Sequence, residues 1–354
     1  MDFVKKFFIL YYFLNIQREL TDKIKLNSFN ISFIMLTFFA VFAFSSINIP
    51  LNEEKSFVSW MRNTNNFYTG DEYKLRLGIY LANQKFVREH NAKPSKTFRV
   101  EMNHFAALTP SEYKSLLGFN QNYVKNLKRA TIQNIKNNDE ELDWRTKGAV
   151  NKIKDQGSCG SCWAFSAVQN CESAEFLKYN ILYRFSEQSL VDCVTADGGC
   201  SGGLPCDAFT YIIEECNGKI MLEDDYPYLA IDDTCKFDES KAVGHFTKYL
   251  EIESGSESDL AAKCAQYGPL SIGIDASQMS FQLYAGGIYD EPKCSSIFLD
   301  HGVGLVGYGS EGGVKYWIVR NSWGASWGEN GYVRMIRGSN QCGEATSATV
   351  IVSE

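Results

Sequence analysis

The sequence predicts an α+β protein of about two folding units, and three stretches carry this prediction. Residues 163–179 have the apolar spacing of a buried helix, and Asn180 is a plausible stop signal for it. Residues 302–309 form a Gly-rich apolar run typical of a strand, and a second apolar strand ends at Asn321. The chain has 354 residues, 45% of them hydrophobic, which is enough for about two units with cores of their own.

The charge and the cysteine content narrow the class of protein. The net charge is −7, divided into +9 for residues 1–138 and −16 for residues 139–354, which argues against general nucleic-acid binding. Eleven cysteines fit an oxidising compartment better than the cytosol.

Residues 1–49 are interpreted as a targeting segment. The apolar run from Phe33 to Phe44 follows two lysines and ends in small residues, which is the layout of a secretory signal. This run is shorter than the roughly 18–20 residues that span a bilayer. A second apolar run at 7–14 precedes it, so a start at Met35 and an uncleaved membrane anchor stay open as alternatives.

A helix is predicted over residues 72–91, with side chains repeating every three or four residues along one stripe. Residues 120–138 are rich in Lys and Asn and lack an apolar period. We interpret them as a linker and as a zone for proteolytic cleavage.

Residues 156–165 bring a cysteine to the start of the predicted buried helix. Gly and Ser favour a tight turn there, and a thiol at a helix N-terminus is shifted toward the thiolate, which attacks carbonyl carbons. Cys159 and Cys162 also read as a C-x-x-C pair. A redox dithiol, a zinc knuckle and two structural disulfides are therefore alternatives to one structural cysteine beside one nucleophile.

A cysteine nucleophile needs a base, and the base needs a group that orients its ring. Of the four histidines, His90 and His104 lie in the basic N-terminal part, and His245 is expected on the surface. His301 opens the Gly-rich strand and is the candidate base. Asn321 follows it, flanked by Trp323 and Trp327, and its amide oxygen would accept the ring N–H of His301.

The string Cys159-Gly-Ser-Cys162-Trp163 resembles the signature of the papain/cathepsin cysteine proteases. Further motifs of that family follow in order: Asp143-Trp144-Arg145 with Gly148-Ala149-Val150 as an opening strand, Ser186 to Cys193, Gly199 to Gly203, Gly286 to Tyr289, Asp300-His301-Gly302 and Tyr316 to Gly324. Upstream, Glu72, Arg76, Tyr80, Asn83, Val87 and Asn91 resemble the interrupted E-R-F-N-I-N motif of cathepsin L-like propeptides. Asn103-His104-Phe105 resembles the companion propeptide strand, with Glu101 and Ala107 in place of the usual Gly and Asp.

The resemblance implies a papain-like two-domain fold, with a helical domain bearing Cys162 and a β-barrel-like domain bearing His301 and Asn321. It implies a zymogen divided into a targeting segment (1–49), an inhibitory propeptide with its linker (50–138) and a mature peptidase (139–354). No insertion resembles the loop that makes cathepsin B a dipeptidase, so we expect an endopeptidase.

The resemblance also assigns roles to residues. Cys162 would be the nucleophile, His301 the base and Asn321 its orienting partner, while Gln156 and the Cys162 N–H would bind the oxyanion. The positions that match the family's substrate cleft are apolar or small: Gly202, Gly203, Leu204, Pro205, Leu299, Gly302, Trp323 and Ser347. The resemblance therefore predicts that the substrate carries a hydrophobic residue two positions before the cut.

Family order further implies three disulfides, Cys159–Cys200, Cys193–Cys235 and Cys294–Cys342. Cys171, Cys206, Cys216 and Cys264 are left over, and a fourth bridge between Cys171 and Cys206 is one alternative to buried free thiols. We expect no cofactor and no metal. The expected partners are protein and peptide substrates, the chain's own propeptide and cystatin-like inhibitors, for a monomer in a lysosome-like acidic compartment or secreted.

Overall fold

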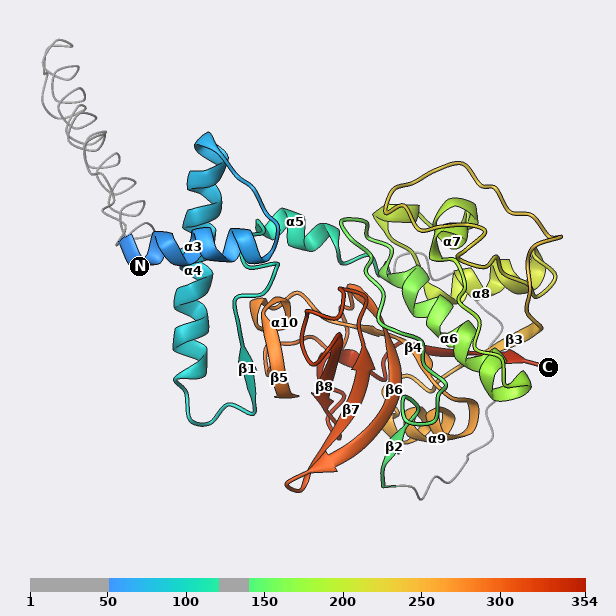
Figure 1. Ribbon diagram of the computed structural model, residues 1–354. Coiled ribbons are helices and arrows are strands. Elements are labelled where there is room, and N and C mark those ends of the chain that lie inside the picture. The colour runs from blue at the N-terminus through green and yellow to red at the C-terminus, as the bar shows by residue number, and fades with distance from the viewer. Residues whose placement is uncertain (1–50, 121–139) are drawn as a thin grey trace, which may run out of the picture. The chain divides into compact units, whose positions relative to one another are not determined.

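The computed structural model describes residues 51–120 and 140–354 (Figure 1). The predicted signal, the alternative anchor and nearly all of the predicted linker lie outside these residues. Residues 57–354 belong to one compact unit. None of the helices in the described residues is both long and apolar enough to cross a membrane.

The first described segment, residues 51–120, contributes three helices and one strand: α3 (Leu51–Asn63), α4 (Gly70–Asn91), β1 (Phe98–Val100) and α5 (Pro110–Ser115). The predicted helix over 72–91 is confirmed as α4. The predicted stripe of α4 makes tertiary contacts, since Arg76 donates to the carbonyl oxygen of Ala107 at 3.0 Å and pairs with Glu112 through both of its terminal nitrogens. Asn83 donates to the carbonyl oxygen of Ala106 at 2.8 Å. Glu112 is the closer carboxyl partner of Arg76, which also pairs with Glu72 at 3.4 Å, and this guanidinium lowers the pKa of Glu112 to about 2.

The helical half of the remaining chain is built around α6 (Cys162–Tyr179). The helix begins one residue before the predicted bound, and Asn180 ends it with a left-handed backbone, φ 58°. Its first fourteen residues are all buried, because the sheet covers one side and further helices the other (Figure 1). Those helices are α7 (Glu187–Cys193), the short η2 (Gly199–Ser201) and α8 (Pro205–Glu214).

The other half is a nine-stranded sheet within the described residues, in the order β1-β5-β8-β7-β6-β4-β9-β3, with β2 paired to β6. Its strands from the enzyme part are β2 (Leu142–Asp143), β3 (Phe246–Glu251), β4 (Leu270–Ile274), β5 (Tyr284–Tyr289), β6 (His301–Glu311), β7 (Val314–Arg320), β8 (Tyr332–Ile336) and β9 (Ala348–Ser353). Helices α9 (Glu257–Tyr267) and α10 (Met279–Gln282) and the short η3 (Gln341–Gly343) lie between strands in the sequence. The propeptide strand β1 pairs antiparallel with β5 and extends the sheet at one edge.

The expectations for the sheet need two adjustments. The sheet is open rather than closed into a barrel, because its first and last strands in the order, β1 and β3, do not pair with each other. The predicted opening strand is short: β2 ends at Asp143, and the residues after it form a turn that starts with the N–H of Arg145 donating to the Asp143 carboxylate. The strands predicted at 302–309 and before Asn321 are confirmed as β6 and β7.

Three disulfides join Cys159 to Cys200, Cys193 to Cys235 and Cys294 to Cys342, the pairs that the resemblance implies. The alternative of a bridge between Cys171 and Cys206 is wrong, because both thiols are free. Cys171 lies in the middle of α6 and faces the core of the helical half, whereas Cys206 packs against a separate apolar cluster beside the cleft. With Cys159 in a disulfide, the redox-dithiol and zinc alternatives also fail. Among the described residues no cluster of side chains could hold a metal ion.

Glu344 is a buried carboxyl group whose two oxygens have no hydrogen-bond partner among the described residues. Burial raises its pKa well above the ordinary value. The folded state therefore keeps a proton that the unfolded chain loses above about pH 4.5, so the free energy of unfolding falls as the pH rises from there. We expect Glu344→Gln to match the parent at pH 4 and to exceed its stability by about 2 kcal/mol at pH 7.

This prediction is tested by denaturant unfolding at both pH values in a Cys162→Ala precursor, so that self-cleavage does not intervene. The exposed Glu214 supplies the control, as Glu214→Gln. Equal stabilities of Glu344→Gln and its parent at pH 7 would contradict the prediction.

Candidate active site

Cys162 is the first residue of α6, and its side chain is fully buried. The turn before it is fixed by Gly157, which has a positive φ of 60°, and by the disulfide of Cys159. The sulfur accepts two backbone N–H groups, from Gly302 at 3.3 Å and from Gly118 at 3.2 Å. The first N–H comes from the residue after His301, so the start of β6 meets the start of α6 at this sulfur.

His301 and Asn321 form a hydrogen bond of 2.8 Å between Nε2 and Oδ1. Oδ1 of Asn321 also accepts the N–H of Ser322, which fixes the orientation of the amide, so Nε2 of His301 must be the donor. Nδ1 then carries the lone pair, and it is buried without a hydrogen-bond partner. The indole of Trp323 lies over the imidazole, with ring centres 4.6 Å apart, and shields the His301–Asn321 bond from water.

Burial shifts the pKa of each of the two candidate catalytic groups toward its uncharged form. Burial raises the pKa of Cys162 to about 12, against the smaller opposing effect of its backbone N–H donors. Burial lowers the pKa of His301 to about 4, although the bond to Asn321 favours the charged ring. Burial in this covered state therefore disfavours both the thiolate and the imidazolium of the predicted pair, since neither charge has solvent to stabilise it.

Gln156 is fully buried beside Cys162 and uses its amide as a donor toward the site. Nε2 donates to the carbonyl oxygens of Leu116 at 2.9 Å and Cys159 at 2.8 Å. Oε1 accepts the hydroxyl of Ser322 at 2.7 Å, which orients the amide so that its N–H groups face the cleft. A carbonyl oxygen of the propeptide thus lies where the resemblance expects an oxyanion.

The propeptide crosses the cleft in an extended conformation. Phe119 forms a parallel bridge with Gly203, whose N–H donates to the Gly118 oxygen at 2.9 Å and whose oxygen accepts the N–H of Asn120 at 3.1 Å. The N–H of Phe119 donates to the oxygen of Asp300 at 3.0 Å. Gly118 is required at its position, because a Cβ there would lie 1.7 Å from the oxygen of Gly160.

The side chain of Phe119 fills an apolar pocket. It packs with Leu204 and Leu299, and Cys206 lies against the same cluster. Gly273 forms another wall, since a Cβ there would lie 2.6 Å from the Phe119 ring. Among the other predicted pocket residues, Ser347 accepts the N–H of Gly273 through its backbone oxygen, Gly302 packs on the start of α6, and Pro205 begins α8.

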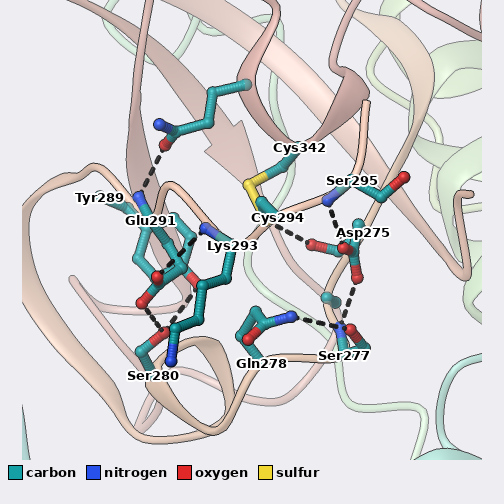
Figure 2. The surroundings of a disulfide bond; sticks show 12 residues. Asp275, Ser277, Gln278, Ser280, Tyr289, Glu291, Lys293, Cys294, Ser295 and Cys342 are labelled. Atoms are coloured by element: carbon teal, nitrogen blue, oxygen red, sulfur yellow. Dashed lines mark hydrogen bonds between the residues drawn. A yellow bond between two sulfur atoms is a disulfide. The ribbon is translucent and has the colours of Figure 1, made fainter. Parts of the chain in front are cut away.

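The segment that leads into Leu299 and His301 is anchored by the Cys294–Cys342 disulfide and by Asp275 (Figure 2). The Asp275 carboxylate accepts the N–H groups of Ser277 at 2.9 Å and Ser295 at 2.6 Å, so it ties β4 to this segment. The Asp300 carboxylate accepts the N–H of Ala276 at 2.8 Å. These bonds hold the segment at both ends, next to the pocket and the imidazole.

Sequence reasoning missed Leu116, Gly118, Phe119, Gly273 and Ser322. Leu116, Gly118 and Phe119 lie just before the predicted linker, and the sequence assigns them no role. The only local signal is Gly118-Phe119, an isolated Gly–aromatic pair at the edge of that linker. Gly273 lies in an apolar strand and gives no local signal, because its importance depends on the ring opposite it. The four residues Cys162, His301, Asn321 and Gln156, by contrast, are brought together around one covered cleft.

The chain belongs to the papain family of cysteine proteases: residues 138–352 match the Papain family cysteine protease domain, and residues 57–113 match the Cathepsin propeptide inhibitor domain (I29). It is 45% identical over 307 residues to a cathepsin L-like peptidase of Aedes aegypti, covering 82% of this chain and 90% of that protein. It is 42% identical over 302 residues to cathepsin L1 of Drosophila melanogaster, covering 80% and 81%.

Solved precursor structures share the fold. Digestive procathepsin L 3 from the larval midgut of Tenebrio molitor superposes with a TM-score of 0.78 at 36% identity, covering 86% of this chain and 100% of that one. The recombinant stem bromelain precursor superposes with a TM-score of 0.78 at 32% identity, covering 86% and 99%. The protein is therefore a cathepsin L-like cysteine protease with a propeptide, the zymogen form of the enzyme.

Proposed function

We propose that this protein is an endopeptidase that works through Cys162, His301, Asn321 and Gln156. The observation that carries the proposal is the free Nδ1 of His301, held by the Asn321 bond and buried beside a cleft in which Cys162 is the nucleophile. Once the cleft opens to water, the Cys162 proton moves to Nδ1 and each charge stabilises the other. The thiolate attacks the scissile carbonyl, and the Gln156 amide and the Cys162 N–H receive the oxyanion. His301 then protonates the leaving amine and activates the water that releases the acyl group.

The propeptide is proposed to inhibit by occupying the cleft without offering a bond to attack. The group of the propeptide at the Cys162 sulfur is the N–H of Gly118, a hydrogen-bond donor rather than an electrophilic carbonyl carbon. The Leu116 oxygen uses the Gln156 donor, and the Phe119 ring fills the apolar pocket. The propeptide thus occupies the Cys162 sulfur, the Gln156 donor and the apolar pocket at the same time.

Replacing Gly118 should loosen this inhibition. In Gly118→Ala the new Cβ meets backbone atoms of Gly160 that cannot move aside, so we expect the precursor to convert to the mature enzyme about tenfold faster at pH 5. Conversion is followed by gel electrophoresis over time. Gly78→Ala is the matched control, because Gly78 lies inside α4 with no heavy atom within 4 Å of its Cβ position, and it should convert at the parental rate. A parental rate for Gly118→Ala would count against the proposal.

The pocket that holds Phe119 is proposed to bind the substrate residue two positions before the cut, with a preference for hydrophobic side chains. Because Gly273 leaves room at the pocket wall, we expect large aromatic residues to fit, and Gly273→Ala to lower the ratio of kcat/KM for Phe over Val roughly tenfold. Paired fluorogenic peptides measure the ratio, and the Val peptide serves as the internal control. An unchanged ratio, or a library profile favouring charged residues, would refute the pocket assignment.

The proposed zymogen consists of three segments. We propose residues 1–49 as a signal, 50–138 as the inhibitory propeptide with its linker and 139–354 as the mature enzyme, a monomer in an acidic lysosome-like compartment or secreted. Protein substrates and cystatin-like inhibitors are the expected partners, without a cofactor.

The decisive experiment labels the acid-treated protein with an epoxysuccinyl thiol-protease inhibitor and identifies the modified peptide by mass spectrometry. One adduct on Cys162, in a chain that begins near residues 137–143, is the expected result. No adduct, or an adduct on Cys206, would overturn the proposed function.

A further inference from the structure

Two carboxyl groups, those of Asp197 and Asp207, interact near the backbone that pairs with the propeptide, and Asp197 packs on that backbone. Asp197 precedes η2, and Asp207 lies in the first turn of α8. Between them in the chain lie Gly203, which pairs with the propeptide, and Leu204, which lines the apolar pocket. The pair thus brackets the backbone that a substrate would contact.

Asp197 supports this backbone in two ways. Its Oδ1 accepts the N–H of Leu204 at 3.2 Å, and its carboxyl group packs on Gly203 so closely that a Cβ there would lie 2.5 Å from Cγ. The same loop is held elsewhere by the Cys159–Cys200 disulfide and by Asp232, which accepts the N–H of Cys200 at 2.6 Å. Asp197 is therefore the support that lies nearest to the substrate-pairing residue.

The second oxygen of Asp197 has no ordinary donor. Oδ2 is buried and receives no hydrogen bond from the described residues, and none of the ion pairs there brings a Lys or Arg to Asp197. The charged and titratable groups around it are acidic: Asp207 and the Cys206 thiol from α8, with Glu251 of β3 acting on the same thiol. A proton on Oδ2 would give this oxygen the role of donor to the Asp207 carboxylate.

The proton belongs on Asp197 rather than on its neighbour. Asp207 lies at the N-terminus of α8, where the helix dipole stabilises a negative charge. Burial, and after it the Asp207 carboxylate, raise the pKa of Asp197 to about 8. The group with the raised pKa therefore keeps its proton at acidic and neutral pH.

We propose that Asp197 and Asp207 share one proton and that this pair positions the Gly203–Leu204 backbone for substrate. When the shared proton leaves to solvent, two carboxylates face each other, and their repulsion displaces the Asp197 side chain on which Gly203 packs. Substrate affinity then falls on the alkaline side. The proposal rests on the proposed function for the role of Gly203 in substrate binding, whereas the shared proton itself does not.

The shared proton is tested in the precursor, which requires no enzymatic activity. The infrared spectrum of the Cys162→Ala precursor is compared with that of the same precursor carrying Asp197→Asn. The difference spectrum should contain the C=O band of a protonated carboxyl group at pH 6 and lose it by pH 9. Other buried acids cancel in this difference. A difference spectrum without that band at pH 6 would overturn the pair.

The positioning role is tested with mature enzyme, by measuring kcat and KM for a peptide with Phe two residues before the cut, from pH 5 to 9, with active-site titration at each pH. The parent should show KM rising above about pH 8, while Asp197→Asn, which keeps an acceptor for Leu204 and a donor for Asp207, should stay flat. Asp197→Ala should raise KM roughly fivefold at pH 6 with kcat within about twofold. The exposed Asp224→Asn is the control and should follow the parent.

If KM of Asp197→Asn rises with pH as it does in the parent, the positioning role is refuted, even if the infrared experiment detects the shared proton. Should Asp197→Ala fail to fold, the comparison of Asp197→Asn with the parent still decides. A protein that cleaves no peptide and takes no label at Cys162 would instead refute the proposed function, and the infrared result would stand by itself.

Discussion

Cys162→Ala should abolish peptide cleavage, with kcat lower by a factor of about 10⁴ to 10⁶, and leave the fold intact. The sulfur is the only nucleophile that the protein supplies in the proposed mechanism, and without it no acyl-enzyme forms for the oxyanion donors to assist. The fold should tolerate the change, because the sulfur accepts only weak hydrogen bonds from backbone N–H groups, among them those of Gly118 and Gly302. Activity after acidification and labelling by the epoxysuccinyl inhibitor measure the first effect, and denaturant unfolding of the precursor the second.

Cys206→Ala is the matched control for this experiment. Among the five free cysteines, Cys206 is the one that is not buried, and it lies beside the cleft, so it is the thiol most able to compete for the label. Its pKa of about 12, raised by burial first and then by nearby acidic side chains, disfavours the thiolate. We expect the Cys206→Ala enzyme to keep its label and its kcat. Turnover near the parental rate in Cys162→Ala would refute the assigned nucleophile.

Gln156→Ala should lower kcat by about 10²- to 10³-fold with a smaller change in KM. The Gln156 amide is oriented before any substrate arrives, since Ser322 holds its oxygen and its nitrogen already donates to the Leu116 carbonyl oxygen in the precursor. A donor fixed in this way stabilises negative charge that develops on oxygen in the transition state more than it stabilises the neutral carbonyl. Steady-state kinetics with a fluorogenic peptide separates the two parameters.

Ser322→Ala provides a graded comparison for this prediction. It removes the hydroxyl that orients the Gln156 amide but keeps the donor itself, so we expect a loss in kcat of roughly tenfold. A kcat within about threefold of the parent in Gln156→Ala would show that the amide does not serve the oxyanion. Equal losses in the two variants would show that orientation, rather than the donor alone, sets the rate.

Local sequence was sufficient for the elements that present the candidate catalytic residues. The apolar spacing after Cys162 and the stop at Asn180 predict α6, and the Gly-rich run after His301 predicts β6. These signals are reliable because a buried helix and a buried strand each impose their own period on the residues they contain. The order of the family motifs along the chain predicts that His301 and Asn321 act together with Cys162.

Only the tertiary structure decided what covers and surrounds these residues. Leu116, Gly118 and Phe119 occupy the cleft through contacts with residues 40 to 181 positions away, and nothing in their own sequence window specifies such partners. The same holds for the free thiols of Cys171 and Cys206, for the buried carboxyl of Glu344 and for the meeting of Asp197 with Asp207. Protonation states depend on burial and on neighbouring charges, so they follow from the packed structure. The sequence by itself thus determined the class of enzyme and its candidate catalytic residues, while packing decided the covered state in which the chain holds them, where burial favours the uncharged forms of Cys162 and His301.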